Sequence, residues 1–187
     1  MAAPAALLWR LGFCWAFVVP GPDGQPHHLK ARNTVKPLPE NTDKYVYLTT
    51  GYGAPAACSP NLVAATQEVL VEGELNGFAL MESLRGDPHI AVQGIAGHGA
   101  QPHTGHLRDH LWDVYVYADR GEKGTAEARQ RWAQAAQQPG CRVHHLPDDL
   151  FPEGVAGIAL AAVGPAALRE RLLSAMGRAQ PTQVTQV

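Results

Sequence analysis

From Glu68 onward, short apolar runs alternate with helical patterns, and this alternation limits the possible fold more than any other feature of the chain. The first run, Val69–Val71, is β-branched and ends at Glu72. A glycine follows, and a helical pattern then covers Glu74–Leu84. Strands that alternate with helices form a mostly parallel sheet with helices packed on it. The sequence therefore predicts an α/β fold.

The remaining elements follow from periodicity and from glycine and proline breaks. We expect strands at 90–92, 113–118 and 142–146, and helices at 104–111, 125–138 and 166–176. The N-terminal region differs, because strand patterns there flank a Pro-Gly-Pro-Asp-Gly turn typical of a hairpin. Its expected strands are 15–19, 28–32 and 44–48, and 51–60 is expected to be a loop. The predicted division is a β-rich N-terminal subdomain (1–55), an α/β domain (56–178) and a disordered tail (179–187).

Composition narrows the class of protein. The 187 residues suffice for a buried core, and the net charge of −2 confines any nucleic-acid surface to a local patch. The three cysteines, Cys14, Cys58 and Cys141, form no CxxC pair, which argues against a zinc finger and favours a reducing cytoplasm. The apolar segment Ala2–Val19 is interrupted by Arg10 and has no preceding basic region. We therefore expect a strand there, and neither a signal peptide nor a membrane span.

Acidic side chains stand at the ends of two predicted strands. Glu72 ends the first strand of the alternating region, and Asp119 directly follows the strand Val114–Ala118. Open α/β sheets bind ligands outside the carboxyl ends of their strands. Carboxylates gathered there are the ligands that Mg²⁺ prefers. The pair therefore predicts a divalent-metal site at this edge of the sheet.

The same two segments resemble known motifs. Val69-Leu-Val-Glu72-Gly-Glu-Leu-Asn-Gly and Tyr115-Val-Tyr-Ala-Asp119-Arg-Gly-Glu-Lys-Gly are similar in order and spacing to the two acidic motifs of a Toprim domain. Bacterial-type DNA primases, topoisomerases and some nucleases share that fold. The N-terminal hairpin, with Arg32 at its end and Lys44-Tyr45 after it, resembles the small subdomain that precedes Toprim in bacterial and phage primases. The resemblance covers roughly residues 13 to 177.

This resemblance implies an activity and a set of site residues. The expected function is a primase-type nucleotidyltransferase core that synthesises short primers on a single-stranded DNA template from nucleoside triphosphates, with Mg²⁺ or Mn²⁺. The expected partner is a replicative helicase or another replication protein. No association with a membrane is expected. By resemblance, Glu72 is a catalytic or metal-organising carboxylate and Asp119 a principal metal ligand. The further metal ligands would be Glu122, Asp148 and Asp149, and the groups contacting template or nucleotide would be Arg32, Lys44, Lys30, Arg120 and His98.

Two positions depart from the family pattern. Gly121 stands where the second acid of the family's Asp-x-Asp is expected, and Asn76 where an acid often follows the first motif. Fewer carboxylates weaken the binding of a hard cation. Two alternatives therefore stay open: a degenerate Toprim module that binds nucleic acid or nucleotide without catalysis, and a Toprim nuclease.

Other reactive side chains suggest weaker hypotheses. His98, His103, His106 and His110 crowd one segment, and the last two have the i, i+4 spacing of zinc ligands. We interpret these histidines as exposed or helix-capping residues. Cys58 precedes a plausible helix start, where a thiol pKa can be lowered, so a Cys–His hydrolase that uses His110 is an alternative. That alternative leaves the acidic strand ends unexplained.

Overall fold

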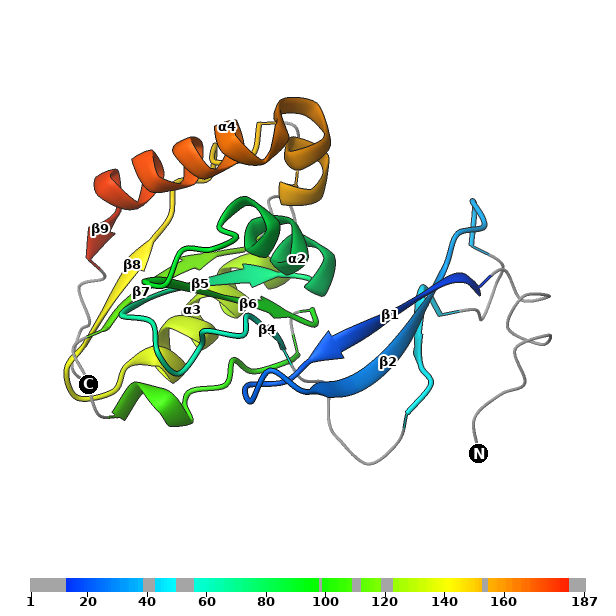
Figure 1. Cartoon of the computed structure of the whole chain (residues 1–187), viewed down its shortest axis with the longest axis horizontal. Helices are drawn as coiled ribbons and strands as arrows, with labels where there is room; N and C mark the ends of the chain where they lie inside the picture. Colours follow the sequence, from blue (N-terminus) through cyan, green and yellow to red (C-terminus); the bar gives the residue numbers. More distant parts are fainter. Residues whose placement is uncertain are drawn as a thin grey trace.

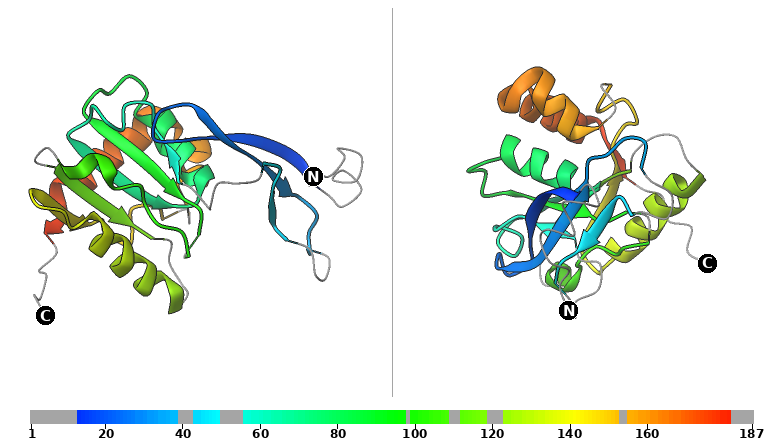
Figure 2. Two further views of the ribbon diagram at one scale, coloured as in Figure 1. Left: turned by 90° about the horizontal axis from the view of Figure 1, so that it is seen from below. Right: turned by 90° about the vertical axis from the view of Figure 1, so that its right-hand side faces the viewer.

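The computed structural model describes residues 13–38, 43–49, 56–97, 99–108, 112–118, 123–152 and 155–181. Within these residues the chain forms two sheets (Figure 1). A small antiparallel sheet projects from one end of a larger layered body, which contains the second, mostly parallel sheet with its helices (Figures 1 and 2).

The small sheet is the predicted N-terminal hairpin with one added strand. Its strands are β1 (Phe13–Pro20), β2 (Pro26–Asn33) and β3 (Tyr45–Tyr47), paired antiparallel in that order. The turn between β1 and β2 is closed by the Asp23 carboxylate, which accepts a hydrogen bond of 3.0 Å from the Gln25 backbone N–H. Gly24 takes a positive φ of 72° there, which explains why a glycine occupies the turn.

The large sheet has the strand order β4-β6-β5-β7-β8-β9. Its strands are β4 (Ala57–Cys58), β5 (Gln67–Glu72), β6 (Ile90–Ile95), β7 (Trp112–Tyr117), β8 (Cys141–His145) and β9 (Gln180–Pro181). The four central strands are parallel and the two edge strands antiparallel, so the predicted mostly parallel sheet is confirmed. The strand β4 lies in a segment that we expected to be a loop, and β9 lies in the expected tail.

Helices cover both faces of the large sheet, as the alternation predicted. They are α2 (Glu74–Ser83), the 3₁₀ helix η1 (Gly105–Arg108), α3 (Lys123–Ala136) and α4 (Ala156–Arg178). The helices α2 and α4 lie on one face and α3 on the other (Figure 1). Along β5, Val69 and Val71 pack with Leu80 of α2, while Leu70 packs on the opposite face with Trp132 of α3. Burial on both faces explains the near-continuous apolar runs of the central strands.

The last helix begins earlier than its pattern predicts. We expected a helix over 166–176, but α4 starts at Ala156 and bends at Gly164, whose φ is 80°. Pro165 follows at the first position of the second helical stretch, where its missing N–H is tolerated. The Gly-Pro pair therefore separates two helical stretches, and the predicted helix over 166–176 lies in the second of them. None of the helices in the described ranges has the length and apolar content needed to cross a membrane.

The helix α2 packs closely on β6 because both contribute glycines. A Cβ atom added at Gly77 would lie 2.7 Å from the Gly94 Cα, and one added at Gly94 would lie 2.9 Å from the Gly73 carbonyl oxygen. Real side chains do not approach backbone atoms so closely, so these positions require glycine. The contact holds the start of α2 directly against the end of β6, beside the end of β5.

A buried polar network lies under the α3 face of the sheet. The Glu68 carboxylate has no exposed surface and accepts hydrogen bonds from the Gln93 side chain and, at 3.1 Å, from His106 Nε2. His103 stacks on His106 with 5.8 Å between ring centroids. The expectation of exposed or capping histidines is therefore wrong for His106, which is almost fully buried because Glu68 requires a buried partner. His98 and His110 lie outside the described residues.

Candidate functional site

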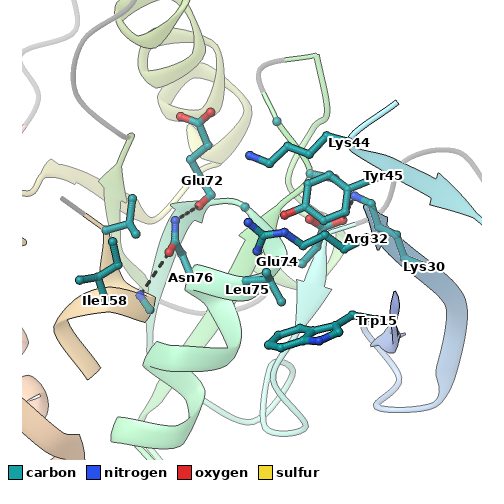
Figure 3. Close-up of a pocket in the computed structure, with 15 residues that line it drawn as sticks. Trp15, Lys30, Arg32, Lys44, Tyr45, Glu72, Glu74, Leu75, Asn76 and Ile158 are labelled. Carbon is teal, nitrogen blue, oxygen red and sulfur yellow. Dashed lines mark hydrogen bonds and ion pairs between the residues drawn. The ribbon is translucent and has the colours of Figure 1, made fainter. Parts of the chain in front are cut away.

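A cleft of about 640 Å³ lies between the small sheet and the carboxyl edge of β5 (Figure 3). Four parts of the chain form it: one face of the small sheet, the turn from β5 into α2, the segment that follows β6, and the start of α4. Its lining residues are Trp15, Lys30, Arg32, Lys44, Tyr45, Glu72, Gly73, Glu74, Leu75, Asn76, Ala96, Gly97, Val155, Gly157 and Ile158. The cleft occupies the position where open α/β sheets bind ligands.

The turn after β5 places one carboxylate in this cleft. Glu72 is the last residue of β5, and Gly73 has a φ of 83°, which turns the chain into α2. The Glu72 side chain is partly exposed and lies on the side of the cleft toward which Lys44 points (Figure 3). The neighbouring strand β7 ends at the same edge, since Val71 pairs with Tyr117.

Asn76 connects the end of β5 to the start of α4. Its Nδ2 donates a hydrogen bond of 2.8 Å to the Glu72 carbonyl oxygen, and its Oδ1 accepts one of 3.3 Å from the Gly157 N–H (Figure 3). An ionised aspartate at this position could still accept the hydrogen bond from the Gly157 N–H. It could not donate one to the Glu72 carbonyl oxygen, because a carboxylate has no hydrogen to donate. The structure thus gives Asn76 a physical role, because its amide holds two elements of the cleft together.

The small sheet presents a row of aromatic and basic side chains to the cleft. Trp15 pairs with Arg32 across β1 and β2, and Arg32 pairs with Tyr45 across β2 and β3, so the three residues share one face. The Arg32 guanidinium and the Lys44 ammonium each lie 5.6 Å from the Tyr45 ring centroid. Burial raises the pKa of the Tyr45 hydroxyl, and the Arg32 charge opposes that rise. The phenol therefore stays neutral at physiological pH, so it does not offset the positive charges of Arg32 and Lys44.

Lys30 and Glu74 form a buried ion pair at the floor of the cleft. Their side chains are 6% and 5% exposed, and the Lys30 ammonium also lies 4.6 Å and 4.9 Å from the ring centroids of Tyr45 and Tyr47. Phe17 packs edge-on against Phe78 of α2 beside this pair. The ion pair and the ring contact attach the small sheet to α2, so Lys30 lines the cleft while its ammonium is paired with Glu74.

The predicted site residues are distributed as follows. Glu72, Arg32 and Lys44 meet in the cleft. Asp148 accepts a hydrogen bond of 2.6 Å from Arg129, and neither it nor the exposed Asp149 is among the described cleft-lining residues. The other predicted residues, Asp119, Arg120, Glu122 and His98, lie outside the described residues, as does Gly121.

A divalent cation fits the described part of the site only incompletely. Glu72 supplies a carboxylate at the cleft, but Glu74 is paired with Lys30 and the Asn76 amide already has two hydrogen-bond partners. In the part of the chain that the structure describes, no group of three or more His, Cys, Asp or Glu side chains is placed to hold a metal ion. The predicted ligands Asp119 and Glu122 lie outside the described residues, so a cation site at this cleft stays a prediction.

The Cys58 thiol does not have the environment of a nucleophile. It is buried in β4, and burial, together with the charges of Glu68 and Asp23, raises its pKa to about 12. The sequence suggested a lowered pKa, which is wrong because Cys58 lies in an edge strand of the large sheet and not at a helix start. The thiol stays protonated, and the Cys–His hydrolase alternative loses its nucleophile.

Sequence reasoning missed Trp15 and Glu74 as parts of this cleft. Trp15 lies on a strand that was correctly predicted, but only the pairing with Arg32 shows that its ring belongs to the basic face. Glu74 resembled an ordinary acidic residue in the first turn of a helix. The available signal was Lys30 in the predicted strand, because a lysine there has to face either solvent or a buried acid.

Comparison with solved structures identifies the fold. The crystal structure of the zinc-binding and RNA polymerase domains of Aquifex aeolicus primase matches 89% of this chain with a TM-score of 0.59 and 16% identity. A DnaG primase catalytic domain bound to single-stranded DNA matches with a TM-score of 0.55 and 16% identity, and the RNA polymerase domain of Mycobacterium tuberculosis primase with 0.52 and 18%, each over 89% of this chain. The fold is primase-type.

The chain spans 40%, 51% and 55% of the lengths of these three solved chains. No protein-family model matches the sequence, and no curated protein matches it either. At these identities the likeness establishes the fold alone. The function has to be argued from the cleft.

Proposed function

We propose that this chain is the core of a primase-type nucleotidyltransferase, with a Toprim domain as its larger part, and that it synthesises short primers on single-stranded DNA. The observation that supports this most strongly is the cleft itself. It joins an acidic strand end, Glu72, to a face with Arg32 and Lys44, on a fold shared with primase cores. Phosphate-rich substrates need cations to bind and a carboxylate near the reacting hydroxyl.

In this proposal each residue has a defined task. Arg32 and Lys44 bind phosphate oxygens of the template or of the incoming nucleoside triphosphate. Glu72 accepts the proton of the attacking 3′-hydroxyl or organises the metal, and Asp119 is its companion ligand. A bound Mg²⁺ or Mn²⁺ would neutralise charge at the attacking and leaving oxygens. The buried Lys30–Glu74 pair keeps the basic face at a fixed position relative to Glu72.

The test is primer synthesis with purified full-length chain. Oligoribonucleotide products on a single-stranded DNA template, with nucleoside triphosphates and Mg²⁺ or Mn²⁺, should disappear in Glu72→Gln and Asp119→Asn. The exposed Glu170 on α4 supplies the matched control, and Glu170→Gln should retain full synthesis. Synthesis that persists in Glu72→Gln at the wild-type rate would refute the assignment. Loss of Mn²⁺ binding in Glu72→Gln, measured by titration calorimetry, would test the metal independently of activity.

A second candidate is a degenerate module that binds nucleic acid or nucleotide without chemistry. The hydrogen bonds of Asn76 to Glu72 and Gly157 favour it, because they commit to structure a position that often holds an acid in Toprim domains. Under this alternative the wild-type chain binds single-stranded DNA and makes no product at any metal concentration. In that case Glu72→Gln leaves binding unchanged, whereas Lys44→Gln weakens it.

A further inference from the structure

Among the aromatic side chains of the small sheet whose burial is described, Trp15 is the most exposed, and it stands in line with the basic groups. Trp15 is 62% exposed, although large aromatic side chains usually bury most of their surface. Its strand partner is Arg32, and the next residue across the sheet is Tyr45. An indole, a guanidinium and a phenol therefore follow one another on one face, and all three line the cleft (Figure 3).

The adjacent row of the same sheet shows what a packed arrangement looks like. In that row Phe17 pairs with Lys30, and Lys30 pairs with Tyr47. There the ring of Phe17 packs on Phe78, and Lys30 is neutralised by Glu74. In the row of Trp15, the ring is open to solvent, so its apolar face is available to a ligand.

We propose that Trp15 stacks on a base of a single-stranded nucleic acid whose phosphates are held by Arg32 and Lys44. This inference rests on the proposed function and specifies how its template is bound. Single-strand binders combine a cationic groove that follows the backbone with aromatic rings on which successive bases stack. A duplex hides the faces of its bases within the stack, so a solvent-exposed ring beside cations selects for unpaired strands. Stacking alone reads no sequence, because every base has a π-face.

Fluorescence anisotropy with labelled oligonucleotides tests the stacking. The probes are a thymidine oligonucleotide of about 12 nucleotides and an abasic strand of the same length, which keeps the phosphates and removes the bases. Trp15→Ala should weaken binding of the thymidine strand by about 5- to 150-fold and leave the abasic strand unaffected. Trp15→Phe should retain most of the affinity, because a ring remains. Val18→Ala, on the same strand and 49% exposed, is the matched control and should bind like wild type.

The outcomes separate the stacking from the proposed function. If the wild type binds the thymidine strand and Trp15→Ala binds it equally well, the stacking is refuted while template binding stands. Equal weakening of both probes in Trp15→Ala would also refute it, because the ring would then act through packing. If the wild type binds neither probe, both proposals fail. Trp15-dependent binding of polyglutamate with equal affinity would show a protein-binding face and overturn the nucleic-acid assignment.

Discussion

Breaking the buried ion pair between Lys30 and Glu74 should be among the most destabilising single changes in the chain. Both side chains are at most 6% exposed, so replacing Lys30 with methionine leaves the Glu74 carboxylate desolvated and uncompensated. Removing one partner of such a pair typically costs about 3–5 kcal/mol. Replacing both partners, in Lys30→Met/Glu74→Leu, should cost far less, because two apolar groups of similar size need no counter-charge.

The assay is urea denaturation of the wild type, the two single variants and the double variant, analysed as a double-mutant cycle. With a slope of about 2 kcal/mol per molar urea, each single change should lower the midpoint by roughly 2 M. The exposed pair of Glu82, in α2, and Arg85, just beyond the end of this helix, is the matched control, and Arg85→Met should cost at most about 0.5 kcal/mol. The small sheet should also lose its position against α2, so primer synthesis or strand binding should fall together with stability.

The reasoning would be refuted if Lys30→Met and Glu74→Leu each cost less than about 1 kcal/mol and showed no coupling energy. That result would mean that water reaches both groups. The attachment of the small sheet to α2 would then rest on packing such as that of Phe17 on Phe78.

Two further experiments test the packing and electrostatics of the large sheet and its helices. Gly77→Ala should destabilise the protein by about 1–3 kcal/mol, because the added Cβ would lie 2.7 Å from the Gly94 backbone. In the control Gly177→Ala the added Cβ meets nothing within 4 Å, so this change should stabilise the protein by about 0.5–1 kcal/mol. Equal shifts of the two melting temperatures in thermal unfolding would contradict the packing argument. Burial alone would raise the pKa of the Asp113 carboxyl group. Hydrogen bonds from His144 and a neighbouring arginine outweigh this effect and hold that pKa below its usual value. Its carboxylate therefore stabilises the fold above about pH 3.9, and this contribution is lost as the pH falls through the lower folded value. Asp113→Asn should accordingly cost about 1 kcal/mol at pH 7 and progressively less toward pH 2, and a pH-independent cost would contradict the assignment.

The pattern of apolar runs predicted the fold class because each pattern reports a local periodicity. The parallel strands read as near-continuous apolar segments, and the helix after Glu72 began one residue past a glycine, as expected. The local signal failed at the edges of the sheet. The strand β4 has two residues and exists through its pairing with β6, and no pattern of that length predicts a strand. The helix pattern likewise missed the part of α4 before Gly164, because small residues give it little periodicity.

The candidate site divides in the same way. The sequence by itself determined that Glu72 ends a buried strand and that Arg32 and Lys44 belong to a separate β-rich segment, since both facts depend on neighbours along the chain. Only the tertiary structure decided that these groups share one cleft. It also decided that Lys30 is committed to a buried carboxylate, and that Trp15 stands exposed beside Arg32. The physical reason is that burial and charge pairing depend on residues distant in sequence. The pattern of a strand does not specify which side chains from other elements pack against that strand.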